Sequence, residues 1–116
     1  MTKSRKVAIL GAGGHALSVA DACASMGLSV VGFITRQSPS IDTRGIPVFS
    51  HLDDIDLNSV EVVLGIGSNF AREDTYREAI SNHPEARFTS VIHSSACVSP
   101  HATIKHGCVV LAQSSV

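Results

Sequence analysis

The chain has 116 residues, of which 44% are hydrophobic and 16% are charged. This length allows one domain, or one domain and a fragment, with one modest core, and so apolar a composition excludes a disordered chain. Nine Lys and Arg nearly cancel ten Asp and Glu, and the net charge of -1 offers no basic surface for nucleic acid. The apolar runs are far shorter than the roughly 20 residues that cross a membrane, so we expect a cytoplasmic protein with no membrane partner. Three cysteines, an odd number without framework spacing, are expected to be reduced thiols.

The first third of the chain has the pattern of a strand, a glycine turn, a helix and a second strand. Residues 7–10 are a continuous apolar run, as in a strand that is buried on both faces, and glycines follow over residues 11–14. Residues 15–26 are rich in Ala, Leu and Val and predict a helix, which Gly27 is expected to end. Residues 29–34 predict the second strand.

The middle of the chain is more polar. Residues 35–45 hold Ser, Pro, Asp and Gly and predict a loop, and residues 46–49 predict a short extended piece. Residues 50–53 fit the capping-box pattern and predict a short helix. The acids at its start are Asp53, Asp54 and Asp56. They could bind a metal, but complementing the dipole of the first helical turn is the interpretation we favour.

A second pattern of strand, helix and strand follows. Residues 61–64 predict a strand, and residues 69–82 predict a helix with an i,i+4 ion pair between Glu73 and Arg77. Residues 88–91 predict a further strand. Strands that alternate with helices predict the α/β class, with a small Rossmann-like parallel sheet flanked by helices.

After residue 91 the hydrophobic period changes to six. Aliphatic residues occupy every sixth position, namely Ile92, Val98, Ile104, Val110 and Val116. Small residues stand four positions after the first four of these, namely Ala96, Ala102, Cys108 and Ser114. Such hexads are typical of a parallel β-helix, in which three hexads form a coil, the aliphatic residue points inward and the small residue turns the corner. Because coils are stable only when several stack, we expect this domain to be truncated.

A glycine motif lies between the first predicted strand and helix. The run Gly11-Ala12-Gly13-Gly14-His15-Ala16 fits G-x-G-x-x-A, in which glycines permit a tight turn and the helix N–H groups can bind a phosphate. An NAD site would have an acid about 20 residues further on, but Thr35 and Arg36 stand there. Three interpretations follow: a phosphate site for a nucleotide or nucleotide sugar, a dinucleotide site in which Arg36 binds the 2′-phosphate of NADP, or a turn that serves only tight packing.

Two further positions near the carboxyl ends of the strands are candidates. His15, at the start of the helix, could donate a hydrogen bond to a phosphate or a sugar hydroxyl, or it could be exposed without a role. A second glycine turn at residues 65–69 includes Gly67. Because parallel sheets bind ligands at the carboxyl ends of their strands, both glycine turns are expected to face one crevice.

The end of the chain contains histidines and cysteines of the kind that bind zinc. They are His93, Cys97, His101, His106 and Cys108. Equivalent positions in successive coils would lie three hexads apart, and no pair of these residues does, so we expect no metal site. We also find no persuasive arrangement of nucleophile, base and acid.

Taken together, these motifs resemble one family, the bacterial sugar acyltransferases of the sialic acid O-acetyltransferase and UDP-bacillosamine N-acetyltransferase type. The matching segments are residues 11–15, 65–69 with Arg72, 91–96 and 98–104. The resemblance covers essentially the whole chain and identifies it as the N-terminal part of such a protein. It implies a Rossmann-like acceptor-binding domain over residues 1–91 and the start of a left-handed β-helix acyltransferase domain over residues 92–116.

The resemblance implies an acetyltransferase of cell-surface glycan biosynthesis. Such an enzyme moves an acetyl group from acetyl-CoA to an amino or hydroxyl group of a nucleotide sugar. Acetyl-CoA is a co-substrate that is bound between coils of adjacent subunits of a homotrimer, and no cofactor is tightly bound. The general-base histidine of the family lies in later coils. We therefore expect it beyond Val116, expect no catalytic residue within this chain, and expect the chain by itself to be inactive.

The resemblance also implies which residues bind the acceptor. They are Gly11, Gly13, Gly14 and His15 of the glycine loop, Thr35 and Arg36 after the second strand, and Gly67 after the third. Relatives often carry paired acids at the second-strand position, where this chain has Thr35 and Arg36.

Two alternatives come from other classes of function. The first is an NADP-type dinucleotide-binding or redox-sensing module, against which the hexad repeat argues because such a module does not need it. The second is a non-enzymatic interaction domain whose exposed hexad edge docks onto a partner.

Overall fold

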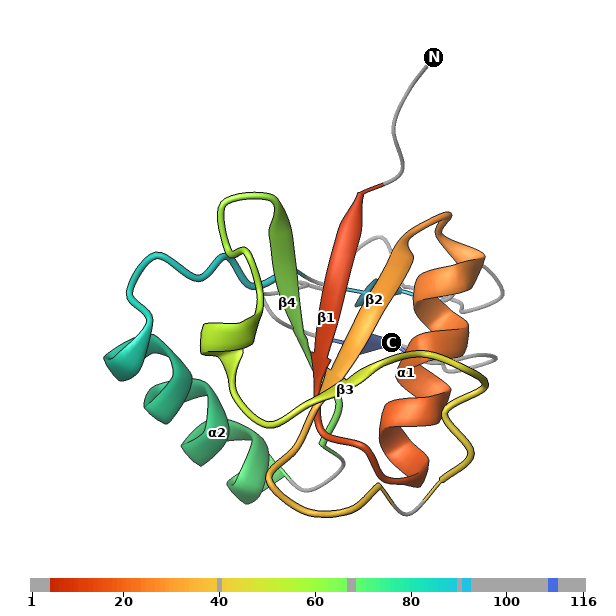
Figure 1. Cartoon of the computed structure of the whole chain (residues 1–116), viewed down its shortest axis with the longest axis horizontal. Coiled ribbons are helices and arrows are strands. Elements are labelled where there is room, and N and C mark those ends of the chain that lie inside the picture. Colours follow the sequence, from red (N-terminus) through yellow and green to blue (C-terminus); the bar gives the residue numbers. More distant parts are fainter. Residues whose placement is uncertain (1–4, 40, 67–68, 90, 93–108, 111–116) are drawn as a thin grey trace, which may run out of the picture.

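Four parallel strands form the central sheet of the protein, in the order β3-β2-β1-β4 (Figure 1). This computed structural model describes residues 5–39, 41–66, 69–89, 91–92 and 109–110. The strands are β1 (Lys6–Leu10), β2 (Ser29–Ile34), β3 (Val48–Phe49) and β4 (Val60–Leu64). The central position of β1, between β2 and β4, confirms the small parallel α/β sheet that the sequence predicts.

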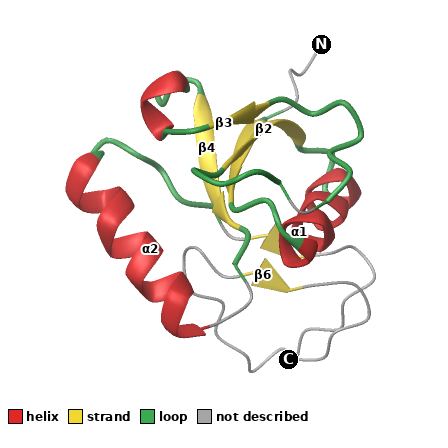
Figure 2. Ribbon diagram, turned by 60° about the horizontal axis from the view of Figure 1, so that its bottom comes forward, coloured by secondary structure: helices red, strands yellow, loops and turns green. Residues whose placement is uncertain are grey.

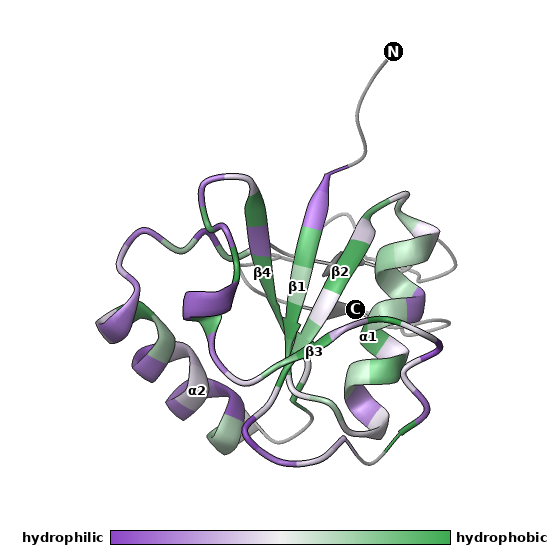
Figure 3. Cartoon of the chain, in the orientation of Figure 1, coloured by the Kyte–Doolittle hydropathy of each residue, from purple (hydrophilic) through white to green (hydrophobic). Residues whose placement is uncertain are grey.

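Two helices cover opposite faces of the sheet, α1 (Gly14–Ser25) and α2 (Asn69–Asn82) (Figure 2). Alternate residues of β1 belong to two cores: Val7 and Ile9 pack with α1, whereas Ala8 and Leu10 pack on the face that α2 covers. A strand buried on both faces needs an unbroken apolar run, and Figure 3 shows this hydrophobicity along the central strands. Within the described part of the chain, neither helix is long and apolar enough to cross a membrane.

Helix α1 buries an apolar face and ends as the sequence predicts. Its buried residues recur at helical spacing and are Ala16, Val19, Ala20, Ala22 and Cys23. Gly27 has a φ of +75°, and its N–H group donates to the Ala24 carbonyl at 3.0 Å. The next N–H group, of Leu28, donates to the Cys23 carbonyl at 2.9 Å. These two bonds form a Schellman motif, which confirms Gly27 as the residue that ends the helix.

Helix α2 has the predicted bounds and packs through a narrow apolar strip. Ala79 is buried, and the Tyr76 ring meets the Phe88 ring edge-on at a centroid distance of 4.8 Å. The predicted i,i+4 ion pair is present, with 2.7 Å between Arg77 Nη2 and Glu73 Oε1. Ile80 also packs against this core, and polar residues of α2 line a pocket between the helix and the sheet.

The prediction of a continuous strand over residues 88–91 was wrong. Phe88 forms a single parallel bridge with Val62 of β4. Strand β5 (Val91–Ile92) pairs instead with β6 (Val109–Val110) in a separate two-stranded sheet. The chain therefore passes from one sheet to another within this segment.

The pairing of β5 with β6 is parallel and bears on the hexad pattern. Ile92 stands opposite Val110, and both are aliphatic hexad positions that lie three hexads apart. This is the register that one coil of three hexads requires. The remaining hexad positions lie outside the described residues, as do Cys97 and Cys108, so the coil stays a prediction.

The predicted capping box was also wrong. The short helix is one turn of 3-10 helix, η1 (Leu52–Asp54), and it begins after His51 without a side-chain cap. Asp56 has a different local role, because its carboxylate accepts hydrogen bonds from the Asn58 N–H group at 3.1 Å and the Ser59 hydroxyl at 3.0 Å. This carboxylate stabilises the turn before β4.

Cys23 gives the fold a pH dependence at alkaline pH. Burial raises the pKa of its free thiol from 9.0 to about 11. Below pH 9 the thiol is protonated in both the folded and the unfolded chain, so this contribution to stability is complete. As the pH rises above 9, the unfolded chain loses the proton first, and on the order of 2 kcal/mol is lost by pH 11. In urea unfolding, the free energy of unfolding should fall more between pH 8 and pH 10.5 for the wild type than for Cys23→Ala. Equal drops would contradict the assignment.

Candidate functional site

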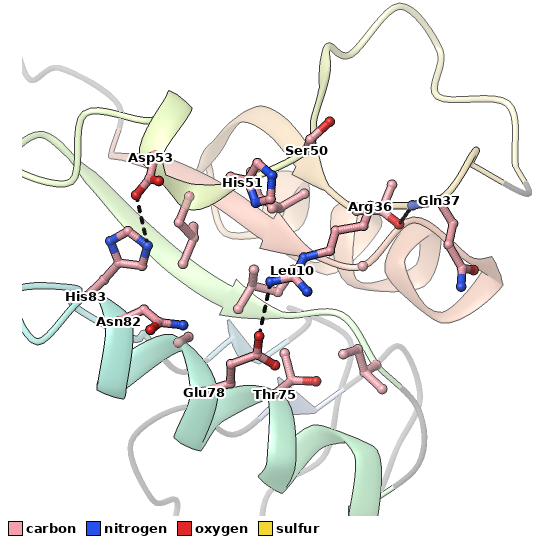
Figure 4. Close-up of a pocket in the computed structure, with 16 residues that line it drawn as sticks. Leu10, Arg36, Gln37, Ser50, His51, Asp53, Thr75, Glu78, Asn82 and His83 are labelled. Carbon is pink, nitrogen blue, oxygen red and sulfur yellow. Dashed lines mark hydrogen bonds and ion pairs between the residues drawn. The ribbon is translucent and has the colours of Figure 1, made fainter.

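A pocket of about 670 Å³ lies between the carboxyl ends of β1, β2 and β4 and helix α2 (Figure 4). The apolar part of its lining comes from Leu10, Ile34, Leu52, Ile66 and Ala79, and Gly11 lies at the turn after β1. In α/β proteins this end of the sheet is where ligands bind, because neighbouring connections diverge to opposite faces and leave a crevice. Its volume is within the range of ligand pockets, roughly 300–1,000 Å³.

The polar lining of the pocket comes from two walls. The sheet wall, formed by the segments after β2 and β3, contributes Thr35, Arg36, Gln37, Ser50, His51 and Asp53. The helix wall contributes Thr75, Glu78 and Asn82 of α2, and His83 directly after it. Figure 4 shows Arg36 and Asp53 of the sheet wall facing Glu78 and His83 of the helix wall. The arrangement offers hydrogen-bond donors and acceptors around an apolar base, as a nucleotide-sized polar ligand requires.

One ion pair and one histidine–carboxylate contact join the walls. Arg36 Nη2 donates to Glu78 Oε1 at 3.1 Å, and His83 Nε2 lies 3.2 Å from Asp53 Oδ1. The His83 side chain is 17% exposed, and its Nδ1 also lies 3.6 Å from Glu85 Oε1. Arg36 and Glu78 are exposed, and exposed pairs contribute little to folding stability. The two contacts thus connect α2 to the sheet wall without being main sources of stability.

The structure separates the predicted site residues into two groups. Gly11, Thr35 and Arg36 line the pocket, together with Ile66 of the second glycine turn. Gly13, Gly14 and His15 do not line it, because they lead into α1 on the other face of the sheet. Gly67 lies outside the described residues.

Close backbone packing explains Gly11. Its φ is +117°, and a Cβ there would stand 2.9 Å from the Gly65 carbonyl oxygen. The Gly11 N–H group donates to the Ile34 carbonyl, and the Gly65 N–H group donates to the Leu10 carbonyl, both at 2.8 Å. These contacts hold the ends of β1, β2 and β4 together beside the pocket. Tight packing thus accounts for this glycine without a ligand.

His15 is partly buried rather than free in solvent. Its Nε2 atom is inaccessible to water and has no hydrogen-bond partner among the described residues. A buried polar atom without a partner costs stability. The structure therefore contradicts the exposure that one interpretation gave His15, and the role of this residue stays a prediction.

Comparison with known proteins gives the family of this chain. The model of the PglD N-terminal domain matches residues 6–79, more than half of the chain. The chain belongs to this family. The matched residues include all four strands of the central sheet, helix α1 and most of α2.

Solved acetyltransferases share the fold of this PglD N-terminal domain. One is the acetyltransferase domain of PglB from Neisseria gonorrhoeae in complex with acetyl coenzyme A, with a TM-score of 0.79 and 29% identity over 97% of this chain and 56% of that chain. Another is a variant of perosamine N-acetyltransferase from Caulobacter crescentus in complex with CoA and GDP-perosamine, with a TM-score of 0.78 and 27% identity over 96% of this chain and 53% of that chain. The chain thus spans about half the length of these acetyltransferases. No curated protein matches it significantly.

Sequence reasoning missed the helix wall of this PglD N-terminal domain. Thr75, Glu78 and Asn82 lie on one face of α2 at i, i+3 and i+7. This polar stripe beside the buried Ala79 was a periodic signal that could have been found. Asp53 was interpreted as a helix-dipole acid, with metal binding as the alternative. Its contact with His83, far away in the sequence, carried no sequence signal.

Proposed function

We propose that this chain is the acceptor-binding part of an acetyltransferase that acts on a nucleotide sugar. The observation that carries the proposal is the pocket at the carboxyl ends of β1, β2 and β4 in a PglD N-terminal domain. The solved neighbours support the class of reaction, because one contains acetyl-CoA and another contains CoA and GDP-perosamine.

The pocket offers a place for each part of such an acceptor. Leu10, Ile34 and Ile66 present apolar surface for a base or ribose ring, and Thr35 and Arg36 present polar groups beside it. Gly13, Gly14 and His15 lie past Gly11 and are proposed to bind the sugar end of the molecule. His15 Nε2 has no protein partner among the described residues but is buried, so it would bind a sugar hydroxyl only after the side chain turns toward the ligand. Gly67 is proposed to contact the acceptor from the turn after β4.

The proposed chemistry is transfer of an acetyl group from the CoA thioester to the sugar. A general base takes a proton from the amino or hydroxyl group, whose lone pair attacks the thioester carbonyl. The carbon–sulfur bond then breaks, and the CoA thiol leaves with a proton. We assign the base and the acetyl-CoA site to hexapeptide coils beyond Val116 in a homotrimer, so residues 1–91 would supply acceptor binding alone.

The domain organisation belongs to the same proposal. Residues 1–91 would form the acceptor domain, and residues 92–116 would begin a left-handed β-helix. The parallel pairing of Ile92 with Val110 supports a coil of three hexads. Helix α1 lies against β5, so the glycine loop would face the coils that carry out the transfer. We place the protein in the cytoplasm, where acetyl-CoA is present.

Isothermal titration calorimetry of the chain tests this proposal. We expect a UDP- or GDP-linked amino sugar to bind with a Kd in the micromolar range and NADPH to bind at least tenfold more weakly. NADPH binding with no binding of either nucleotide sugar would contradict the proposal and support the dinucleotide alternative. The longer protein, with its later coils, should transfer acetyl groups to the same sugar, whereas this chain should not.

A further inference from the structure

Arg36 is the one arginine or lysine among the described residues that line the pocket. Its guanidinium extends from the sheet wall across the pocket to α2 (Figure 4). Its Nη2 atom donates to Glu78 Oε1 at 3.1 Å. This is the side-chain contact that Arg36 makes among the described residues. Because a guanidinium has five N–H donors, it retains the capacity to bind a further oxyanion.

The backbone around Arg36 is held in place although its side chain is exposed. The N–H group of Thr35 donates to the Phe49 carbonyl at 2.9 Å and so continues the pairing of β2 with β3. The Thr35 hydroxyl oxygen accepts from the Gln37 N–H group at 3.2 Å. The Arg36 side chain is 69% exposed, so it can exchange one hydrogen-bond partner for another while its backbone stays in place.

Among the described residues that line the pocket, Arg36 is the one side chain with a permanent positive charge, and the lining also includes the histidines His51 and His83. The N-terminus of α1 could attract an anion, but Gly13, Gly14 and His15 do not line the pocket. The carboxylates of Glu78 and Asp53 both do, and each would repel a phosphate. Arg36 therefore offers a phosphate the strongest charge complement in the lining, and a phosphate bound there would compete with Glu78 for the guanidinium.

We propose that Arg36 binds the phosphate of the ligand, and that Glu78 occupies the place of this phosphate in the free protein. This inference rests on the proposed function, because it names the residue with which the pocket selects a nucleoside phosphate. On binding, the guanidinium exchanges the Glu78 carboxylate for phosphate oxygens, with which it can form two parallel hydrogen bonds. Glu78 thus weakens ligand binding and contributes to the release of the nucleotide.

The alternative is that the pair only fastens α2 to the sheet. The two roles predict opposite effects of Glu78→Gln. If the Arg36–Glu78 pair only holds α2 against the sheet, the substitution weakens ligand binding or lowers the melting temperature. If Glu78 competes with the ligand, the substitution strengthens the binding of a phosphate-bearing ligand and leaves that of the nucleoside unchanged.

The test is calorimetric titration of the chain and its variants with UDP, GDP and dTDP, each beside its nucleoside. For the diphosphate that binds the wild type, Glu78→Gln should lower Kd about three- to fivefold and Arg36→Gln should raise it tenfold or more. The Kd of the nucleoside should change less than twofold in both variants.

Glu73→Gln and Arg77→Gln are matched controls, because this exposed ion pair lies on the same helix and outside the pocket lining. Both should leave the Kd of the diphosphate unchanged. If the diphosphate binds the wild type but Glu78→Gln does not tighten it, the exchange is overturned while the proposed function stands. If no diphosphate binds any variant, both proposals are overturned.

Discussion

Replacing Gly65 with alanine is expected to lower the free energy of unfolding by about 3 kcal/mol, among the largest effects of any single methyl group in this protein. A Cβ at this position would clash with Ile9 Cγ2 and would lie 3.1 Å from the Leu10 carbonyl oxygen and 3.2 Å from the Ala16 Cα atom. Two of these are backbone atoms, of β1 and of α1, which cannot move aside as the end of a side chain can. The added methyl group must therefore push β4 away from β1 and α1 beside the pocket.

Urea unfolding followed by circular dichroism measures this loss. Gly14→Ala is the matched control, because a Cβ at Gly14 meets nothing within 4 Å. Alanine is also the better helix former at the start of α1, so this variant should stay within about 0.5 kcal/mol of the wild type. Similar stability of Gly65→Ala and Gly14→Ala would contradict the close approach of β4 to β1.

Replacing Phe88 with alanine is expected to cost about 4 kcal/mol. The Phe88 ring is 2% exposed, packs edge-on against Tyr76 of α2, and belongs to a residue that bridges to Val62 of β4. Its removal leaves a cavity where α2 contacts the sheet. Since α2 has few other apolar contacts, the loss of the Phe88 ring should also loosen the helix wall of the pocket. Nucleotide binding should therefore weaken in the same variant.

Phe70→Ala is the control for this substitution. Phe70 lies on the same helix but is 79% exposed, so the same change there should alter the free energy of unfolding by less than about 0.5 kcal/mol. If Phe88→Ala is too unstable to measure, Phe88→Leu should keep the fold and lose a smaller amount. Equal effects of Phe88→Ala and Phe70→Ala in urea unfolding would show that Phe88 does not anchor α2.

The sequence predicts those parts of the fold that depend on local pattern. The bounds of β2 and α2 agree with the prediction, because an apolar run and helical periodicity are properties of neighbouring residues. Gly27 was identified as the end of α1 for the same reason. The strand over residues 88–91 was predicted wrongly, because nothing local indicates that the chain passes to a second sheet.

The candidate site could be predicted only in part. Topology alone places Gly11, Thr35 and Arg36 at one edge, because the carboxyl ends of parallel strands meet there. The opposite wall depends on how α2 lies over the sheet, and the contact of Asp53 with His83 follows from that packing. The separation of Gly13 and His15 from the pocket has the same origin, since it depends on which face of the sheet α1 covers.

The measurement that tests the central claim most directly is nuclear magnetic resonance of the ¹⁵N-labelled chain during titration with a UDP- or GDP-linked amino sugar. The claim is that the acceptor binds between the sheet and α2. We predict saturable shifts of the amide signals of Thr35, Gln37, Asp53 and Asn82, whose residues line the pocket. The amides of Ser18 and Asp21, on the exposed side of α1, should not move. Shifts confined to α1, with the pocket amides unchanged, would contradict the claim.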